Sequence, residues 1–266
     1  MSDYDVVVYP DADAVAGAAS DRLVATLVES RAQDSRAQDS PFHVVLTGGT
    51  VGIKTLEQAA ANPNARAVDW STVHFWWGDE RFLPEGHPDR NETQARGAFL
   101  DEFADAIPPE NIHFVPRLDP TAGVDTPEIA AELYEKELAA FSPTGDGVPT
   151  FDVLLLGMGP DGHVASLFPN HPGLTAKGWT TGVRESPKPP PLRVSLTFNA
   201  IAQAKAVWLV VAGTDKADAV ASAWSGAPRE VTPAGFVAGT EETLWFVDEG
   251  AKPKHTRPGG ANDSGE

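Results

Sequence analysis

FDVLLLGMGPDGHVASLFP, residues 151–169, joins a continuous apolar run to a glycine-rich turn. An apolar run such as residues 151–156 is typical of a strand in a parallel sheet whose two faces are both covered. The turn places Asp161 and His163 just beyond the carboxyl end of this strand. Open α/β sheets bind ligands at that edge, so we expect this titratable pair to lie in the functional site.

Apolar runs with helical patterns between them extend on both sides of this stretch. The expected strands are residues 4–9, 42–46, 73–77, 112–115, 193–198, 206–211 and 243–247. The expected helices are residues 12–29, 92–103, 126–141 and 215–224, with a further helix that ends near residue 61. This alternation predicts an α/β fold: an open, mostly parallel, Rossmann-like sheet with helices on both faces and right-handed crossovers.

The length of 266 residues suits one large domain or two closely joined ones. We expect residues 1–250 to form a single α/β domain and residues 251–266, rich in Gly, Pro, Lys and Asp, to be a disordered tail. The pentapeptide RAQDS occurs twice in tandem, at residues 31–35 and 36–40, which indicates a short duplication at a solvated helix end.

Composition and charge exclude several classes of protein. The absence of cysteine removes disulfides, thiolate metal sites and thiol nucleophiles, and it suits a cytoplasmic protein. No apolar run approaches the roughly 20 residues of a membrane span, and the acidic N-terminus lacks the features of an export signal. The net charge of −18 argues against a nucleic-acid partner. A small anionic ligand stays compatible, because a few fixed cations dominate a local pocket.

Three glycines of the central turn, Gly157, Gly159 and Gly162, match the spacing of a dinucleotide-binding motif. That motif also requires a regular helix, a second strand and an acidic residue about 20 positions later. The prolines that follow, at positions 169, 172, 187 and 189–191, do not fit such a unit, so we expect no nicotinamide cofactor. The glycines more simply allow a tight turn that directs backbone amides at an anion.

His163 is the leading candidate for a catalytic group, because it follows a glycine turn and an acidic residue. Asp161 is the candidate for holding the orientation and tautomer of the imidazole. The alternative for Asp161 is a helix cap or a turn residue. Ser166 is a poor nucleophile candidate, because no G-x-S-x-G motif surrounds it.

Three further turns follow expected strands and carry candidate binding residues. They contain Gly48, Gly49 and Thr50 in the first turn, Asp79 and Arg81 in the second, and Lys216 in the third. Backbone amides at the start of a helix bind phosphate or carboxylate, and a lysine there neutralises an anion. The alternatives are paired glycines that serve only geometry, a solvated charge run, and a surface lysine. Neither clustered metal ligands nor a Walker motif is present, so we expect no metal and no nucleotide cofactor.

These motifs resemble those of the 6-phosphogluconolactonase family, within the larger glucosamine/galactosamine-6-phosphate isomerase group. The matching segments, in order, are LTGGT at 46–50, WWGDERFLP at 76–84 with Asn91 following, LLLGMGPDGHVASLFP at 154–169, SPKPPPLRVSLT at 186–197, GTDKADAV at 213–220 and LWFVDEGA at 244–251. The deaminase branch of that group has a Tyr-like ending where this chain has Arg81, and a carboxylate after its histidine where this chain is apolar. The lactonase branch is therefore the closer resemblance.

The resemblance implies hydrolysis of 6-phospho-D-glucono-1,5-lactone, with no cofactor, by a monomer or small homo-oligomer. His163 would serve as general base and then acid, with amides of the 157–162 turn, including Gly159, near the oxyanion. Groups implied to hold the 6-phosphate are Arg81, Lys216 and the amides of Gly48, Gly49 and Thr50, with Arg193 as a further candidate and Arg184 left undecided. A deaminase or isomerase, and a non-catalytic sugar-phosphate-binding protein, stay as alternatives.

Overall fold

The computed structural model describes residues 4–30 and 41–253. The tandem pentapeptides at 31–40, and residues 254–266 of the expected tail, lie outside the described residues. Within the described ranges, no helix combines the length and the apolar character that crossing a membrane would require. The expectation of a single domain over residues 1–250 stays a prediction.

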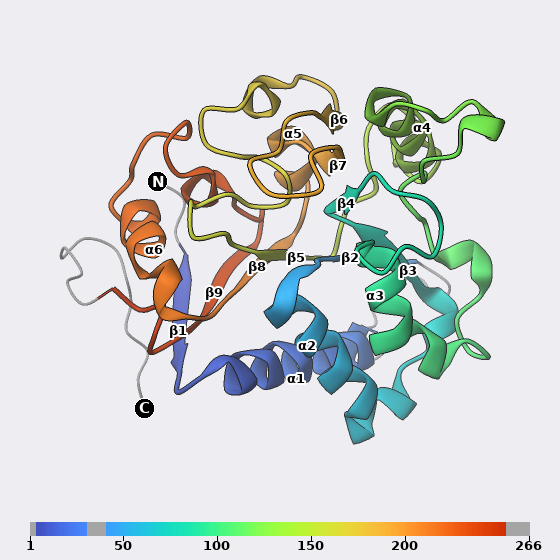
Figure 1. The fold of residues 1–266 in the computed structure, drawn as a ribbon. Coiled ribbons are helices and arrows are strands. Elements are labelled where there is room, and N and C mark those ends of the chain that lie inside the picture. The colour runs from blue at the N-terminus through green and yellow to red at the C-terminus, as the bar shows by residue number, and fades with distance from the viewer. Residues whose placement is uncertain (1–3, 31–40, 254–266) are drawn as a thin grey trace.

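Six strands form a parallel sheet in the order β1-β9-β8-β5-β2-β3 (Figure 1). In chain order they are β1 (Asp5–Tyr9), β2 (Phe42–Leu46), β3 (Val73–Trp77), β5 (Val153–Gly157), β8 (Ala206–Val211) and β9 (Glu242–Asp248). Every neighbouring pair is parallel, so all six carboxyl ends meet at one edge of the sheet. The expected α/β fold is confirmed.

Helices cover this sheet on both sides. They are α1 (Ala12–Ser30), α2 (Gly49–Ala61), α3 (Asn91–Ala98), α4 (Pro127–Ala140), α5 (Phe198–Ile201) and α6 (Ala217–Trp224). Figure 1 shows α1 and α2 below the large sheet, α4 and α5 above it, and α6 at the left beside β1. The buried residues of α1 recur at helical spacing, from Val15 through Ala19 and Leu23 to Leu27, so one apolar stripe faces the sheet.

A second, smaller sheet was not expected. Its three antiparallel strands lie in the order β4 (Asp79–Arg81), β7 (Arg193–Leu196) and β6 (Thr180–Val183). The segment 193–198 was expected in the parallel sheet, and this placement is wrong. Its strand ends at Leu196, because the Thr197 hydroxyl accepts from the Ala200 amide and starts α5.

The expected strand at residues 112–115 is also wrong. Ile112 makes a single parallel bridge to Phe75 in the edge strand β3, and no strand is formed. Beyond that point the Val115 carbonyl accepts a hydrogen bond from the Arg90 guanidinium at 2.8 Å. A buried side chain therefore satisfies a backbone group that a strand would have paired with its neighbour.

Two expected helices are shorter than their sequence patterns indicate. The helix expected at 92–103 ends at Ala98, because Phe99 leaves the helical region with φ −152° and ψ −54° and a 3₁₀ turn follows. The helix expected at 215–224 begins at Ala217, after a 3₁₀ turn that contains Lys216. Both differences fall at helix ends, where the terminal turn is often 3₁₀.

The sheet reverses its strand order between β2 and β5. From β2 the chain moves outward to β3, whereas from β5 it moves the other way to β8 and β9. The loops that leave two such strands separate and open a crevice at their carboxyl ends. Thr47, after β2, bridges the two loops by accepting the Gly157 amide at 3.2 Å. The topology therefore places the first glycine turn beside the central one.

Candidate active site

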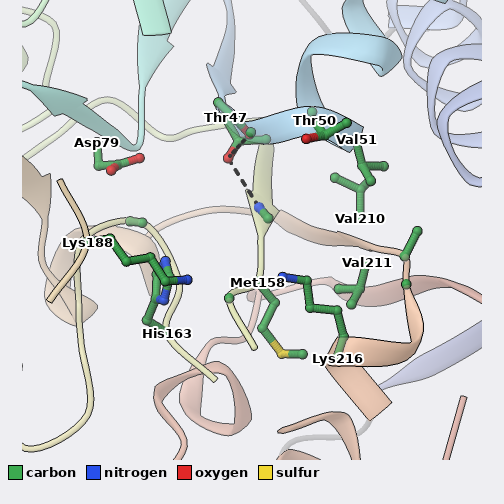
Figure 2. Close-up of a pocket in the computed structure, with 18 of the residues that line it drawn as sticks. Thr47, Thr50, Val51, Asp79, Met158, His163, Lys188, Val210, Val211 and Lys216 are labelled. Atoms are coloured by element: carbon green, nitrogen blue, oxygen red, sulfur yellow. Dashed lines mark hydrogen bonds between the residues drawn. The ribbon is translucent and has the colours of Figure 1, made fainter. Parts of the chain in front are cut away.

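A cavity of about 570 Å³ opens at this crevice (Figure 2). The candidate residues that line it are Gly48, Gly49, Thr50, Asp79, Arg81, Gly159, His163, Arg193 and Lys216. Asp161 is hydrogen bonded to the His163 side chain. The fold thus brings together residues from five separate segments of the chain, which sequence spacing alone could only suggest.

The glycine turn after β5 holds the imidazole through its own backbone. The Gly159 amide donates to the His163 carbonyl at 3.0 Å, and the Gly162 amide donates to the Gly159 carbonyl at 2.9 Å. A Cβ at position 159 would lie 2.1 Å from the His163 ring. Gly162 has φ +82°, in the left-handed region that favours glycine. The backbone of the turn therefore packs closely against the imidazole ring of His163.

His163 and Asp161 form a close pair, with 2.5 Å between Nδ1 and Oδ1. Burial by itself raises the pKa of Asp161, but the hydrogen bond and the charge of His163, with Lys188, outweigh it and lower the pKa to about 2. Asp161 is thus an ionised acceptor at neutral pH, and Nδ1 carries the proton. With the Nδ1 proton held by Asp161, Nε2 is the ring nitrogen left to take a proton, which is the arrangement of a general base.

The start of α2 supplies a second feature of the cavity. The helix begins at Gly49, and its N-cap residue Gly48 provides no side-chain hydrogen bond to the first turn. Uncapped amides at such a start attract an anion. Gly48 also packs against Asn91, where a Cβ would lie 1.9 Å from the amide oxygen. A side chain at position 48 would therefore displace Asn91 from the cavity wall.

Lys216 enters the cavity from the turn after β8. Gly213 has φ +109°, and its amide donates to Asp248 at the end of β9, at 3.0 Å. The Lys216 ammonium lies 3.1 Å from Asp215 Oδ2, and its side chain is 20% exposed. Sequence reasoning missed both aspartates. Asp248 fixes the turn, and Asp215 holds the ammonium at the cavity wall.

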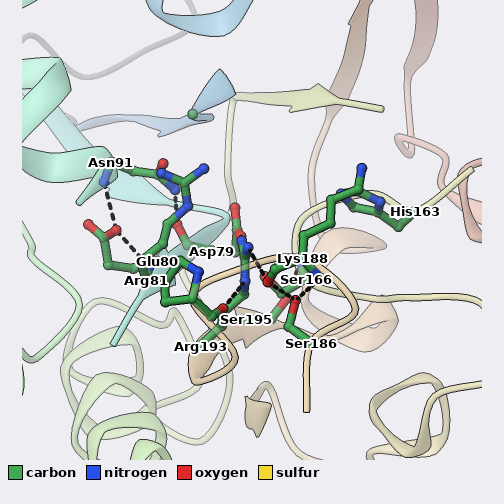
Figure 3. A network of polar contacts seen from close by, with 12 residues as sticks. Asp79, Glu80, Arg81, Asn91, His163, Ser166, Ser186, Lys188, Arg193 and Ser195 are labelled. Atoms are coloured by element: carbon green, nitrogen blue, oxygen red, sulfur yellow. Dashed lines mark hydrogen bonds and ion pairs between the residues drawn. The ribbon is translucent and has the colours of Figure 1, made fainter. Parts of the chain in front are cut away.

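The Asp-Glu-Arg segment of β4 divides between two directions (Figure 3). Asp79 and Arg81 line the cavity, whereas Glu80 accepts the amides of Asn91 at 2.7 Å and Glu92 at 2.9 Å, at the start of α3. Burial raises the pKa of Glu80 to about 7, although Arg90 and three backbone amides oppose the rise. Successive side chains of a strand point to opposite faces, so Glu80 points away from the face that Asp79 and Arg81 share. Glu80 caps a helix and does not face the cavity.

The arginines differ in how many hydrogen bonds each guanidinium already makes within the protein. Arg193 is 5% exposed and donates to the carbonyls of Lys188, Pro189 and Pro190 at 3.1 to 3.2 Å. Arg184 is paired with Glu128 and is not among the cavity-lining residues. Arg81 lines the cavity and gives one N–H to a backbone carbonyl. Arg193 therefore serves mainly to hold a loop.

Lys188 is the cavity residue that sequence reasoning overlooked most clearly. It lines the cavity, and its ammonium lies 3.8 Å from Asp161 Oδ1, the atom that binds the imidazole. Figures 2 and 3 both show its side chain alongside His163. The available signal was a lone lysine inside the proline-rich segment SPKPPP at 186–191. Only Arg193, which follows that segment, was considered.

Comparison with known proteins identifies one family. The model described as Glucosamine-6-phosphate isomerases/6-phosphogluconolactonase matches residues 10–245. A protein named 6-phosphogluconolactonase from Streptomyces coelicolor is 49% identical over 255 residues, covering 94% of this chain and 95% of that protein. Another of that name, from Mycobacterium leprae, is 46% identical over 250 residues, covering 94% and 97%. The crystal structure of 6-phosphogluconolactonase from Thermotoga maritima is 27% identical with a TM-score of 0.73, covering 92% of this chain and 100% of that chain.

Proposed function

This chain belongs to the glucosamine-6-phosphate isomerase/6-phosphogluconolactonase family, and we propose that it hydrolyses 6-phospho-D-glucono-1,5-lactone to 6-phospho-D-gluconate. This is the second step of the oxidative pentose phosphate pathway, and we place it in the cytoplasm. The observation that carries the proposal is the juxtaposition of two features in one cavity. An imidazole oriented by an ionised carboxylate faces the same space as Lys216 and the uncapped start of α2.

The first half of the reaction needs a base. His163 Nε2 takes a proton from a water molecule, and the water oxygen bonds to C1 of the lactone. The electron pair of the carbonyl moves onto the carbonyl oxygen, which becomes an alkoxide. Asp161 stabilises the imidazolium that forms, because its carboxylate accepts a hydrogen bond from Nδ1–H, with 2.5 Å between Nδ1 and Oδ1.

The second half needs an acid. The alkoxide electron pair re-forms the C1 carbonyl while the bond between C1 and the ring oxygen breaks. His163 returns its proton to the departing ring oxygen, so the imidazole is neutral again. The product is an open-chain acid, which loses a proton to solvent. One side chain can serve both steps because its carboxylate partner keeps the ring in place between them.

The phosphate end of the substrate is assigned to the opposite wall. Lys216, Arg81, Gly49 and Thr50 all line the cavity from segments other than the catalytic turn. Charge-assisted hydrogen bonds from these groups would fix the lactone carbon near His163 and disfavour unphosphorylated sugars.

The proposal is tested by adding the protein to freshly prepared phosphogluconolactone and following 6-phosphogluconate with a coupled dehydrogenase. A reaction without the protein corrects for spontaneous opening of the lactone. We expect acceleration well above that background. Binding of 6-phosphogluconate without acceleration would instead identify a sugar-phosphate-binding protein. Release of ammonia from glucosamine 6-phosphate would identify a deaminase.

A further inference from the structure

The loop that carries Lys188 is fixed at its backbone by two side chains. The Ser186 hydroxyl donates to the Lys188 carbonyl at 2.9 Å and accepts the Lys188 amide at 3.3 Å. The buried Arg193 guanidinium donates to the Lys188 and Pro189 carbonyls, both at 3.1 Å. It also lies over the Phe168 ring, which packs against His163 with 4.5 Å between ring centroids. Arg193 thus links the backbone of Lys188 to the wall that supports the imidazole.

The ammonium of Lys188 is held in the cavity without a hydrogen bond. Its distance of 3.8 Å from Asp161 Oδ1 is too long for one, and among residues 4–30 and 41–253 no hydrogen bond from this ammonium is formed. Burial lowers the pKa of Lys188, and the charges of Lys216 and Arg193 add to that effect, whereas Asp161 and Asp215 oppose it. Its donors are therefore available to a ligand.

The three glycine amides of the turn are poor candidates for the oxyanion site. Gly157 donates to Thr47, Gly159 donates to the His163 carbonyl, and Gly162 donates to the Gly159 carbonyl. These three N–H groups are engaged within the protein. A side-chain donor beside His163 is therefore the alternative for the developing alkoxide.

We propose that Lys188 is a further catalytic residue, whose ammonium donates a hydrogen bond to the C1 carbonyl oxygen as that oxygen becomes an alkoxide. The inference rests on the proposed lactone hydrolysis. Lys188 shares one carboxylate oxygen with the imidazole, so it lies at the end of the cavity where C1 must be. Lys216 enters from a different strand and faces it across the cavity (Figure 2).

The ammonium keeps its proton throughout the cycle. It pairs with the alkoxide when water adds to C1, and the pairing weakens when the carbonyl re-forms and the ring bond breaks. Because the interaction is strongest at the intermediate, it lowers the barrier without tightening substrate binding equally. Loss of one such donor costs about 10²–10³ in kcat.

The test compares Lys188→Met with Lys177→Met, a matched change at an exposed lysine outside the cavity lining. We expect Lys188→Met to lower kcat about 10²–10³-fold and Lys177→Met to leave it unchanged. Lys188→Arg should recover part of the loss, because it restores a cationic donor. Thermal unfolding of all three variants checks that they fold. If Lys188→Met does not fold, Lys188→Gln replaces it in the comparison.

Two ligands separate this role from phosphate binding. Glucitol 6-phosphate carries the phosphate but has no C1 carbonyl, so Lys188→Met should leave its affinity unchanged. The affinity for 6-phosphogluconate, whose C1 carboxylate would meet Lys188, should weaken. Weaker binding of glucitol 6-phosphate with an unchanged kcat would overturn the inference in favour of a phosphate contact.

An unchanged kcat in Lys188→Met, beside an active wild type, would overturn this inference and leave the proposed function intact. A wild-type protein that does not accelerate lactone opening would overturn both. The two failures are thus distinguished by the wild-type rate alone.

Discussion

Histidine side chains lie at both ends of the large sheet, and each end pairs an imidazole with a carboxylate. At the carboxyl ends of the strands, His163 binds Asp161 and faces the cavity. Near the amino end of β3, His74 contacts His113 at 2.9 Å, and His113 contacts Glu137 at 2.7 Å. The same pairing therefore occurs in two very different surroundings.

The difference lies in what covers the rings. His113 stacks on Trp76, with ring centroids 3.8 Å apart, and also packs against Phe141. Burial lowers the pKa of His74 to about 4 and also lowers the pKa of His113. His163 instead projects from a glycine turn into an open cavity lined by cations. An imidazole beside a carboxylate is therefore not enough for a site. The ring must also meet a space that a substrate can enter.

The sharpest test of this comparison removes one histidine from each end. His163→Ala should lower kcat about 10²–10⁴-fold, because it removes the general base and acid. His113→Phe keeps the aromatic stack and should leave kcat nearly unchanged, while costing stability through lost hydrogen bonds. The coupled lactone assay and chemical unfolding measure the two effects. An unchanged kcat in His163→Ala would contradict the assignment of His163 as the general base.

Gly159→Ala tests whether the turn, and not merely the imidazole, makes the site. The new Cβ would lie 2.1 Å from the His163 ring, so the ring must move. A displacement of about 1 Å in a catalytic group costs about 10² in rate. We expect a loss of this order in kcat with little change in unfolding temperature. A fully active variant would show that the ring position is not critical.

Lysines at the two ends of the sheet allow a similar comparison. Lys216→Met should raise KM for the phosphorylated lactone roughly tenfold to a hundredfold, because a charged hydrogen bond contributes about 1.5–3 kcal/mol. Lys205, which pairs with Asp152 at 3.0 Å away from the cavity, is the matched control. Steady-state kinetics of both variants give the result. Equal KM values for Lys216→Met and the wild type would exclude a phosphate contact.

The smallest expected effect concerns pH and the half-buried His74. The pKa of His74 is lowered from 6.5 to about 4 in the folded protein, so the unfolded chain binds more protons in that range. Stability should therefore fall as the pH drops from about 6.5 toward 4. His74→Phe should reduce this fall, as measured by urea unfolding at pH 7.5 and pH 5.

Glu80 affects the same measurement with the opposite sign. Its pKa is raised to about 7, so its contribution is present below pH 4.5 and is lost as the pH rises through 7. Glu80 is present in both the wild type and His74→Phe, so the difference between these two isolates the histidine. Identical pH dependence in the two proteins would contradict the role assigned to His74.

The sequence identified the six strands of the large sheet, together with two segments that do not join it, and most of the cavity lining. Long apolar runs identify buried parallel strands, and glycines after those strands mark the loops of the crevice. The small sheet was not predicted, because β4 and β6 are only three and four residues long and have the sequences DER and TTGV. Without β4, the alternation that turns Glu80 away from the cavity could not be inferred.

The position of Lys188 and the pairing of His74 with His113 were not predicted, because both depend on contacts between distant segments of the chain. The position of Lys188 depends on Arg193 and Phe168, and nothing in the local sequence specifies that arrangement. His74 and His113 are 39 residues apart and meet only because the chain returns beside β3. Pairs of this kind follow from tertiary packing, which a pattern of single residues does not reveal.

The position of β9 has a consequence for biosynthesis. Among the described residues this strand comes last, yet it lies between β1 and β8, and its final residue, Asp248, holds the Gly213 turn that precedes Lys216. While the ribosome is still adding β9, the growing polypeptide already contains His163, Lys188 and Lys216, but β1 has no neighbour and the Lys216 turn has no anchor. Catalytic activity should therefore appear only after β9 has been synthesised.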